Sequence, residues 1–577
     1  MTVQADAPAS APSAAPSAAS SPGPSASRLR GVPLPDPLTV AVLVVAALVA
    51  LPVLVVGSNV LRSSDGVWAH LAATVLSRYV VNTAVLALGV GLGTFVVGVG
   101  TAWLVTMCRF PGRRAMEWAL LLPMAVPAYV MAYAYTDLLQ FPGPLQSWIR
   151  AATGWSRRDY WFPEIRSMGG AVAMLTLVLY PYVYLLARAA FLEQSVCVLE
   201  VSRTLGRGPW STFARVALPL ARPAVVAGLA LVTMETLAEF GTVQYFAVDT
   251  FTTGIYRTWF GMGSPTAAAQ LAASLMLFVL VVLVLERATR GQARFHHTTG
   301  RYRTLPRYPL RGGRAAVALV ACLLPLVLGF LLPVGILARL AWREGDRLFG
   351  ALFAELAWHS FALGAMAAGV AVAVALLLAY GRRLRPTPLV GAAVRVAGMG
   401  YAIPGAVIAV GVLLPFAWID NAVDGWARAT LGVSTGLLLT GTVAAVLFAY
   451  LVRFLAVSYN TVEASLGKIS PSIDRAAHVF GRSPGQAMAR IHGPLMLSSL
   501  FTAALLVFVD VLKELPATMI IRPFNFETLA VRVYRLASDE RLAEAATPAL
   551  AIVAVGIIPV VLLSRAIARS RPGGPVD

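Results

Sequence analysis

Apolar runs long enough to cross a lipid bilayer recur along the whole of this chain. A helix needs about 20 residues to cross a hydrocarbon core of about 30 Å, whereas the strands of membrane barrels are shorter and alternate in polarity. Only 13% of the 577 residues are charged and 58% are hydrophobic, which leaves too little polar surface to cover a water-soluble globule. We therefore predict an all-α polytopic membrane protein.

Twelve membrane spans can be placed on these runs, with ends defined to within about four residues. Several of the runs are rich in Gly and Pro, so we expect kinked helices. The predicted spans cover about residues 38–56, 80–107, 115–139, 169–190, 224–247, 266–286, 315–341, 359–380, 389–417, 432–455, 497–520 and 542–565.

The placement of arginine predicts the orientation of the chain. The segment 287–314 holds eight arginines and no acidic residue, and the short connections 109–114 and 382–385 hold three each. Because cytoplasmic connections of membrane proteins are enriched in Lys and Arg, these segments should face the cytoplasm, and both termini with them. Clusters confined to alternate connections also argue against nucleic acid as the reason for the formal charge of +19.

An internal repeat divides the chain into two copies. Each copy holds six predicted spans, an even number, so both copies enter and leave the membrane on the same side. This predicts two parallel six-helix repeats related by a pseudo-two-fold axis along the membrane normal, with a path between them that suits transport. The matched segments are Gly206 with Gly481, Pro219 with Pro494 and ETLAEF (235–240) with DVLKEL (510–515) at an offset of 275, and Thr83 with Ser360 and Pro127 with Pro404 at an offset of 277.

The repeat also predicts the organisation of the chain. We expect an Ala/Pro/Ser-rich disordered cytoplasmic tail, two six-span membrane halves, and an Arg-rich cytoplasmic linker between them. In each half, a polar cytoplasmic loop follows the fourth span. The segments are the tail at 1–33, the first half at 34–290 with its loop at about 195–222, the linker at 291–314, and the second half at 315–577 with its loop at about 468–496.

The repeated loop has the pattern of a helical hairpin. A short amphipathic helix through Ser202 should end at Gly206, because glycine adopts the left-handed conformation that closes helices. A second short helix should begin at about Pro209 and end before Pro219. Two such hairpins on one face would form a docking platform for a two-fold partner. The alternative is that each hairpin is an interfacial helix that merely caps the bundle.

This loop resembles that of the permease subunits of binding-protein-dependent ABC importers, which reads Glu-Ala-Ala, three residues, Gly, nine residues, Ile-x-Leu-Pro. The second copy departs from it with Arg475 at the acidic position and Gly493 at the leucine position. Segments that begin at Phe110, Tyr180, Gly400 and Lys513 extend the resemblance to fused, two-half ferric-iron permeases over nearly everything after the tail. The retained loop positions are Glu200, Gly206, Leu218 and Pro219 in the first copy and Ala476, Ala477, Gly481, Ile491 and Pro494 in the second.

The resemblance implies partners and a location. In that family the loop is a coupling helix that inserts into a cytoplasmic ATPase, and an extracytoplasmic binding protein delivers the substrate. We therefore expect an ABC ATPase dimer, a substrate-binding protein and the lipid bilayer as partners, no nucleic acid, and a place in the bacterial inner membrane. The nearest match to a P-loop, at 467–470, lacks the upstream glycine and the hydroxyl residue after lysine. ATP hydrolysis would therefore belong to a separate subunit, and this chain would be neither an enzyme nor a cofactor carrier.

Ionisable residues within the predicted spans are candidates for a translocation path, because an isolated charge in hydrocarbon is costly. Glu235 and Glu239 are four residues apart, which predicts one shared helix face. Asp510 and Glu514 occupy the matching positions of the second copy. An equally open interpretation is that Lys513 simply pairs with Asp510 or Glu514, or that these residues lie near a hydrated end of the span.

Tyrosines of the third span, Tyr129 and Tyr133, could add phenolic oxygens to such a path, and these suit a hard ferric ion. Tyrosines also serve as interfacial or interhelical hydrogen-bond donors, and that interpretation stays open. No resident metal or cofactor site is predicted, because the remaining candidates have no ligand spacing: Cys108, Cys197, Cys322 and the pair His296-His297 in the linker.

Alternatives remain at this level. Thiamine or a polyamine could replace iron as the cargo of an importer. A proton- or sodium-coupled secondary transporter could use Glu239, Asp510 and Glu514 as coupling carboxylates, but it gives no reason for the duplicated loops. A membrane-embedded enzyme is disfavoured, because no nucleophile with its base is recognisable in the sequence.

Overall fold

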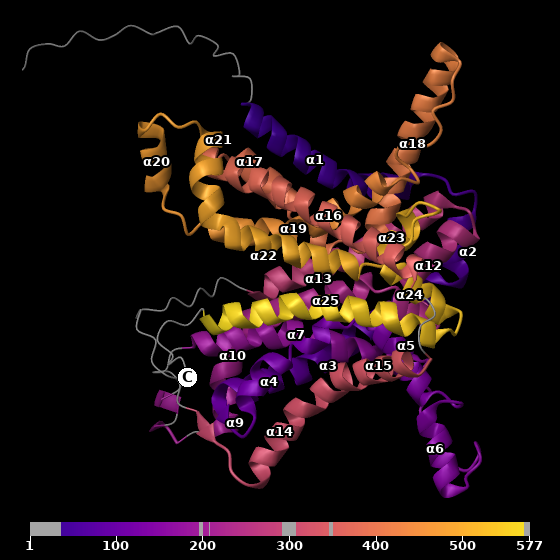
Figure 1. The fold of residues 1–577 in the computed structure, drawn as a ribbon, viewed down its shortest axis with the longest axis vertical. Helices are drawn as coiled ribbons and strands as arrows, with labels where there is room; N and C mark the ends of the chain where they lie inside the picture. Colours follow the sequence, from indigo (N-terminus) through magenta and orange to yellow (C-terminus); the bar gives the residue numbers. More distant parts are fainter. Residues whose placement is uncertain are drawn as a thin grey trace, which may run out of the picture.

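The computed structural model describes residues 36–194, 200–202, 204–206, 208–290, 307–344 and 350–569. The predicted tail at 1–33, Cys197, His296-His297 and most of the predicted linker lie outside the described residues. The described chain is almost entirely helical (Figure 1). Its two short strands, β1 (Cys108–Arg109) and β2 (Tyr308–Pro309), pair in parallel with Cys108 opposite Tyr308. The predicted all-α membrane fold is confirmed.

The helices keep the order of the sequence. Those of the first half are α1 (Pro37–Ser58), α2 (Val67–Thr74), α3 (Leu76–Met107), α4 (Arg113–Ala119), α5 (Ala128–Leu139), α6 (Pro144–Thr153), α7 (Met168–Glu193), α9 (Pro209–Thr212), α10 (Leu218–Ala238), α11 (Gly241–Tyr245), α12 (Phe251–Tyr256) and α13 (Pro265–Arg290). Those of the second half are α14 (Gly313–Leu326), α15 (Leu332–Glu344), α16 (Ala351–Leu384), α17 (Pro388–Ala397), α18 (Gly405–Leu431), α19 (Val443–Leu466), α20 (Pro471–Val479), α21 (Pro484–Ala487), α22 (Gly493–Leu512), α23 (Pro516–Ile521), α24 (Leu529–Ser538) and α25 (Leu542–Arg569).

Within the described residues, eleven helical segments are long and apolar enough to cross a bilayer, and a helix pair bent by 92° brings the number to twelve. The bend falls at Pro127, and the corresponding break between α17 and α18 falls at Pro404. The predicted span 115–139 is therefore broken at its proline, in agreement with the expected kinks, whereas the predicted span 389–417 is divided between α17 and α18, and its membrane-crossing helix extends to Leu431. The residue before a proline is disfavoured in helical conformation, and Val126 and Ile403 are accordingly extended.

The spans that follow the two polar loops begin earlier than predicted. α9 continues through a π-helical turn, Phe213–Ala217, into α10, so the predicted end of a separate helix before Pro219 is wrong. The second half repeats this arrangement, with the π-helical turn Met488–His492 between α21 and α22. The wider turn accommodates a proline that has no N–H to donate, so one helix runs from the loop into the membrane.

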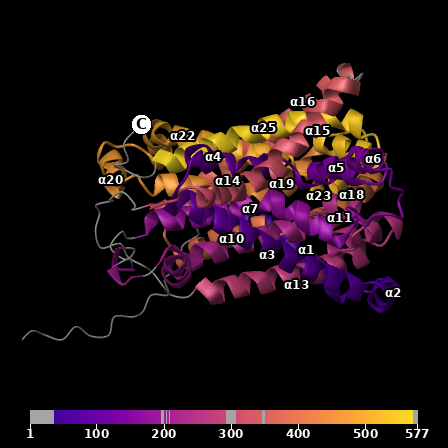
Figure 2. The same cartoon turned by 90° about the horizontal axis from the view of Figure 1, so that it is seen from below.

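Matching hydrogen bonds confirm that the two halves are structural repeats. Thr83 Oγ1 accepts the backbone N–H of Phe251 at 3.4 Å, where α12 begins. At the equivalent place, Ser360 Oγ accepts the N–H of Leu529 at 2.7 Å, where α24 begins. The polar loops of both halves lie at the same end of the molecule, and the distal ends of α6 and α18 lie at the other (Figures 1 and 2).

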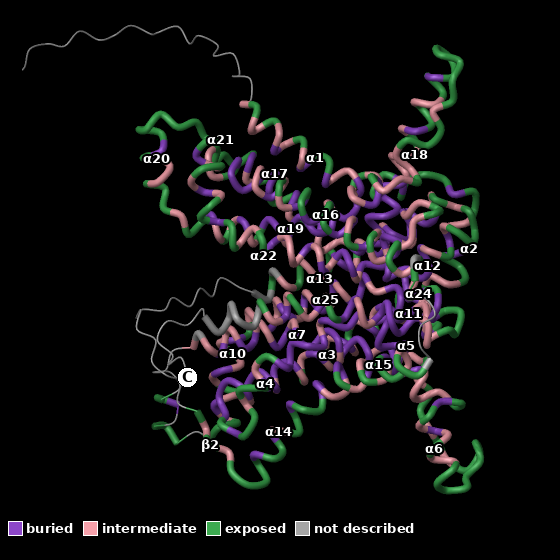
Figure 3. The backbone as a smooth tube through the Cα atoms, in the orientation of Figure 1, coloured by how far each residue is buried: buried purple, intermediate pink, exposed green. Residues whose placement is uncertain are grey.

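The hydrophobic cores do not follow the boundaries of the repeat. α14, α15 and α25 pack into the core of the first half, whereas α1 and α13 pack into the core of the second. For example, α1 lies beside α17 and α18 (Figure 1). Buried residues concentrate where these elements meet, and the ends of α6 and α18 are largely exposed (Figure 3). The first and last spans of each half thus pack against the core of the other half, and this exchange holds the two halves together.

We predict that Ser360→Ala lowers the free energy of unfolding by about 1–3 kcal/mol, because the buried N–H of Leu529 loses its acceptor. Thermal unfolding of the purified protein in detergent would measure the loss. Thr502→Ala is the matched control, since Thr502 is exposed and its hydroxyl bonds only within its own helix. It should change stability by no more than about 0.5 kcal/mol. Equal effects of the two variants would contradict the role given to Ser360.

Candidate functional site

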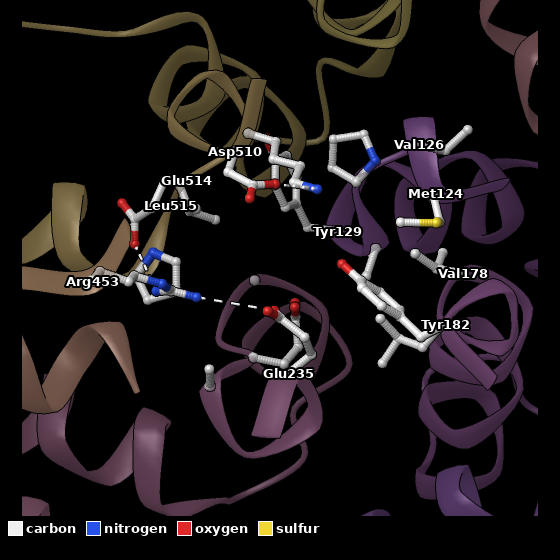
Figure 4. A pocket seen from close by; sticks show the side chains of 18 of the residues that line it. Met124, Val126, Tyr129, Val178, Tyr182, Glu235, Arg453, Asp510, Glu514 and Leu515 are labelled. Atoms are coloured by element: carbon white, nitrogen blue, oxygen red, sulfur yellow. Dashed lines mark hydrogen bonds and ion pairs between the residues drawn. The ribbon is translucent and has the colours of Figure 1, made fainter. Parts of the chain in front are cut away.

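A polar cavity of about 100 Å³ lies where the two halves meet. Its walls include residues of α5, α7 and α10 from the first half and of α19 and α22 from the second. The ionisable and phenolic residues that line it are Glu235, Glu239, Asp510, Glu514, Arg453, Lys513, Tyr129, Tyr182 and Tyr401 (Figure 4). The structure therefore brings the four predicted acids to one place.

Two of these acids cap short helices that follow the spans. Glu239 lies just beyond the end of α10, and its carboxylate accepts the N–H of Thr242 in α11 at 2.8 Å. Glu514 accepts the N–H of Ala517 in α23 at the same distance. The predicted helix face shared by Glu235 and Glu239 is therefore wrong. The helix ends before Glu239 because this carboxylate satisfies the first free N–H groups of the next helix.

Arg453 on α19 connects the two halves. Its guanidinium is 3.1 Å from Glu514 Oε1 and 4.0 Å from Glu235 Oε2. Tyr401 donates to the other carboxylate oxygen of Glu235 at 2.9 Å. Gly405 leaves space for this arrangement, because a Cβ there would lie 2.2 Å from a guanidinium nitrogen. Arg453 was not among the predicted site residues, although an arginine inside the predicted span 432–455 is a sufficient signal.

The remaining pair of charges is local. Lys513 Nζ lies 2.9 Å from Asp510 Oδ1, one helical turn away. The alternative that Lys513 pairs with a neighbouring acid is therefore confirmed for Asp510. Glu514 pairs with Arg453 instead.

The acidic residues of the cavity occupy matching positions in the two halves, whereas the cationic residues have no charged counterpart in the first half. Four carboxylates face two cations, which leaves a formal charge of −2 when all are ionised. At the offset of 275 that relates α7 to α19, the matched lining positions are Glu235 with Asp510, Glu239 with Glu514, Val178 with Arg453 and Ala238 with Lys513. Both halves thus contribute acid, but only the second contributes positive charge.

The predicted tyrosines differ in position. Tyr129 lines the cavity, is only 3% exposed, and its buried hydroxyl has no hydrogen-bond partner among the described residues. Tyr133 does not line the cavity, and its ring packs edge-on against Tyr245 with centroids 4.5 Å apart. Across the part of the chain that the structure describes, no group of three or more His, Cys, Asp or Glu residues is arranged to hold a metal ion.

Both polar loops turn at a left-handed glycine, as predicted. The φ angles are +73° at Gly206 and +68° at Gly481. In the second loop, the N–H of Gly481 bonds to His478 at 2.9 Å and that of Arg482 to Ala477 at 3.0 Å. This pair of bonds is a Schellman motif, which satisfies the last carbonyls of α20 and ends it.

Each loop has one buried and one exposed face. In the first, the buried hydroxyls of Ser202 and Thr212 lie 2.9 Å apart, and alanines occupy both matching positions of the second. On the exposed face, Leu205 and Phe480 precede the two glycines and are 72% and 80% exposed. The other retained positions are the exposed Glu200 and Ala476, the buried Ala477, Leu218 and Pro219 at the start of α10, Ile491 in a π-helical turn and Pro494 at the start of α22.

Asp474, which was not among the predicted site residues, anchors the second loop. Its carboxylate lies 2.6 Å from Arg383 at the end of α16 and 3.0 Å from the imidazole of His492. Arg383 also donates to the carbonyls of Leu466 and Ile469. Arg475, which replaces the acid of the motif, is exposed. The acid that holds this loop therefore lies one position earlier.

Comparison with known proteins agrees with this architecture. Residues 94–289 match the family model described as the binding-protein-dependent transport system inner membrane component. Over these residues the chain carries the membrane domain of such a permease. Together with its apolar helices, the match makes the permease a multi-pass inner-membrane protein.

Similar proteins cover both halves or only one. The permease is 27% identical to the Fe(3+)-transport system permease protein FbpB 2 of Haemophilus influenzae, over 84% of this chain and 89% of that protein. It is 24% identical to the putative ferric transport system permease protein FbpB 1 of the same organism, over 81% and 73%. The molybdenum transport system permease protein ModB of Escherichia coli is 27% identical over 34% of this chain and 87% of its own length. All three relatives are named as permease proteins of transport systems.

We predict that Glu514→Gln destabilises the permease far more than Glu239→Gln. An amide at Glu239 can still accept the N–H of Thr242 through its one oxygen, whereas an amide at Glu514 keeps only one of the two N–H bonds that this carboxylate accepts through its separate oxygens. Only Glu514→Gln removes the near partner of the buried Arg453, which should cost about 3–5 kcal/mol of unfolding free energy. The loss for Glu239→Gln should be about 1 kcal/mol. Thermal unfolding of the two purified variants makes the comparison, and equal losses would contradict a stabilising role for the Arg453 pair.

Proposed function

We propose that this chain is the membrane permease of an ABC importer that moves ferric iron. The observation that supports ferric iron as the substrate is the lining of the cavity between the halves. Carboxylates outnumber cations there, and phenolic oxygens add further hard donors. Such a lining favours a hard cation over an oxyanion. The relatives named as ferric permeases also cover most of this chain, whereas the molybdenum permease covers a third of it.

The two polar loops would be the docking sites of a separate ATPase dimer. Their exposed apolar residues, Leu205 and Phe480, occupy matched positions of the repeat. Exposed apolar side chains beside a rigid helix end are suited to insertion into a partner's cleft. ATP would be bound and hydrolysed by that dimer, and this chain would carry no cofactor of its own.

An extracytoplasmic binding protein would deliver the ion at the opposite face. In this orientation the loops, both termini and the Arg-rich linker at 291–314 are cytoplasmic, in agreement with the distribution of arginine. Because the halves exchange their outer spans, closure of the ATPase dimer would move two linked bodies against each other around the central cavity.

We predict that Leu205→Glu combined with Phe480→Glu abolishes ATP-driven uptake of radiolabelled ferric iron into proteoliposomes that contain the permease, its ATPase and its binding protein. Two charges in an apolar contact should weaken ATPase binding by about tenfold or more. The control is Leu431→Glu, which is 65% exposed at the opposite end and should retain the ATPase on co-purification. Uptake that continues without ATP and follows an imposed proton gradient would instead indicate a secondary transporter.

The proposed orientation predicts opposite labelling of two single-cysteine variants. In a background with Cys108, Cys197 and Cys322 replaced by alanine, a membrane-impermeant maleimide should label Leu431→Cys from the outside of the inner membrane. It should label Leu205→Cys only after the membrane is opened. The reverse pattern would overturn the orientation.

A further inference from the structure

We propose that Glu235, Glu239, Asp510 and Glu514, the acidic ring, form a transient site for a hard trivalent cation, which Arg453 and Lys513 occupy as resident counter-ions until the cation enters. This inference rests on the proposed function, because it assigns a binding site within the permease to the cargo of that function. It adds that the permease itself holds the ion instead of only opening a passage.

The first observation is the unsatisfied hydroxyl of Tyr129. This side chain is 3% exposed and lines the cavity, yet its hydroxyl has no hydrogen-bond partner within the described chain. Glu239 and Glu514, one acid from each half, line the same cavity. A buried hydroxyl is costly to leave without a partner, so this oxygen is available to a ligand that the cavity admits.

The second observation is the symmetry of the acids. A site between two repeats places equivalent residues around the pseudo-two-fold axis, and the acidic ring has this property, with Glu235 matched to Asp510 and Glu239 to Glu514. The cations break the symmetry, because Val178 and Ala238 occupy the positions that match them. Both halves thus contribute carboxylates to the acidic ring, whereas only the second half contributes the cations that neutralise them.

The third observation is how the counter-ions are held. Arg453 lies 3.1 Å from Glu514 in its own half but 4.0 Å from Glu235 in the other half. Figure 4 shows Arg453 between these two acids, with the hydroxyl of Tyr182 directed into the same space. Glu235 also accepts a hydrogen bond from Tyr401 at 2.9 Å, so an entering cation must replace both this bond and the longer Arg453 contact. No three-ligand group is preformed among the described residues, so the acids must move closer together when the cation replaces their present partners.

Terbium(III) tests the proposal without transport. It is a hard trivalent ion whose emission is sensitised by a nearby tyrosine, and Tyr129, Tyr182 and Tyr401 all line the cavity. The full chain in lipid nanodiscs would be titrated with terbium as wild type, Arg453→Gln and Arg453→Lys. Removing the counter-ion should raise sensitised emission and tighten binding by at least about tenfold, while Arg453→Lys should resemble the wild type.

A triple variant, Arg453→Gln with Glu235→Gln and Glu514→Gln, completes the test. It should lose the terbium signal, and gallium(III), which has the charge of ferric iron but no redox chemistry, should displace terbium from Arg453→Gln. If Arg453→Gln stays monodisperse but binds terbium no better than Arg453→Lys, the resident counter-ion is refuted. If the triple variant retains the signal, the ion binds elsewhere. Ferric uptake by the complete wild-type assembly tests the proposed function separately, and either result can hold without the other.

Discussion

The compensation of charge in the central cavity is the constraint on which the arrangement of the two halves depends. Arg453 is nearly buried, and a buried guanidinium deprived of its partner would cost several kcal/mol. One of its acids lies in its own half and the other in the opposite half, so the halves must keep their alignment for both to reach it. Glu514 adds a second link, since the same carboxylate also caps α23. Gly405 makes this geometry possible by leaving space beside the guanidinium.

The repeat preserves backbone structure more strictly than chemistry. Matched prolines break the third span of each half, matched π-helical turns lead from loop to membrane, and matched hydroxyls cap α12 and α24. The charges diverge, with both cations of the cavity in the second half. A passage between two halves of similar backbone structure can thus have a symmetric shape but an asymmetric electrostatic field. Shape follows from local backbone constraints, whereas single substitutions change the charge.

Several features of the site could be predicted because they depend on nearby residues. Gly206 and Gly481 end helices through their own left-handed conformation, and an offset of 275 was enough to pair the acids. The shared face of Glu235 and Glu239 could not be predicted correctly, because hydropathy continues past the point where α10 ends. That end is set by the N–H groups of α11, which need the carboxylate. The role of Asp474 could not be predicted, because its partner Arg383 lies 91 residues away in the sequence.

By itself, the sequence determined the class of fold, the number and order of spans, the duplication and the turns of the two loops. All of these follow from hydropathy, repeat spacing and glycine conformation, which act over a few neighbouring residues. Only the tertiary structure decided that the halves exchange their outer spans, that Arg453 lies between acids of both halves, and that Tyr129 faces the cavity while Tyr133 does not. These outcomes depend on packing and charge compensation between segments far apart in the chain, which no local pattern encodes.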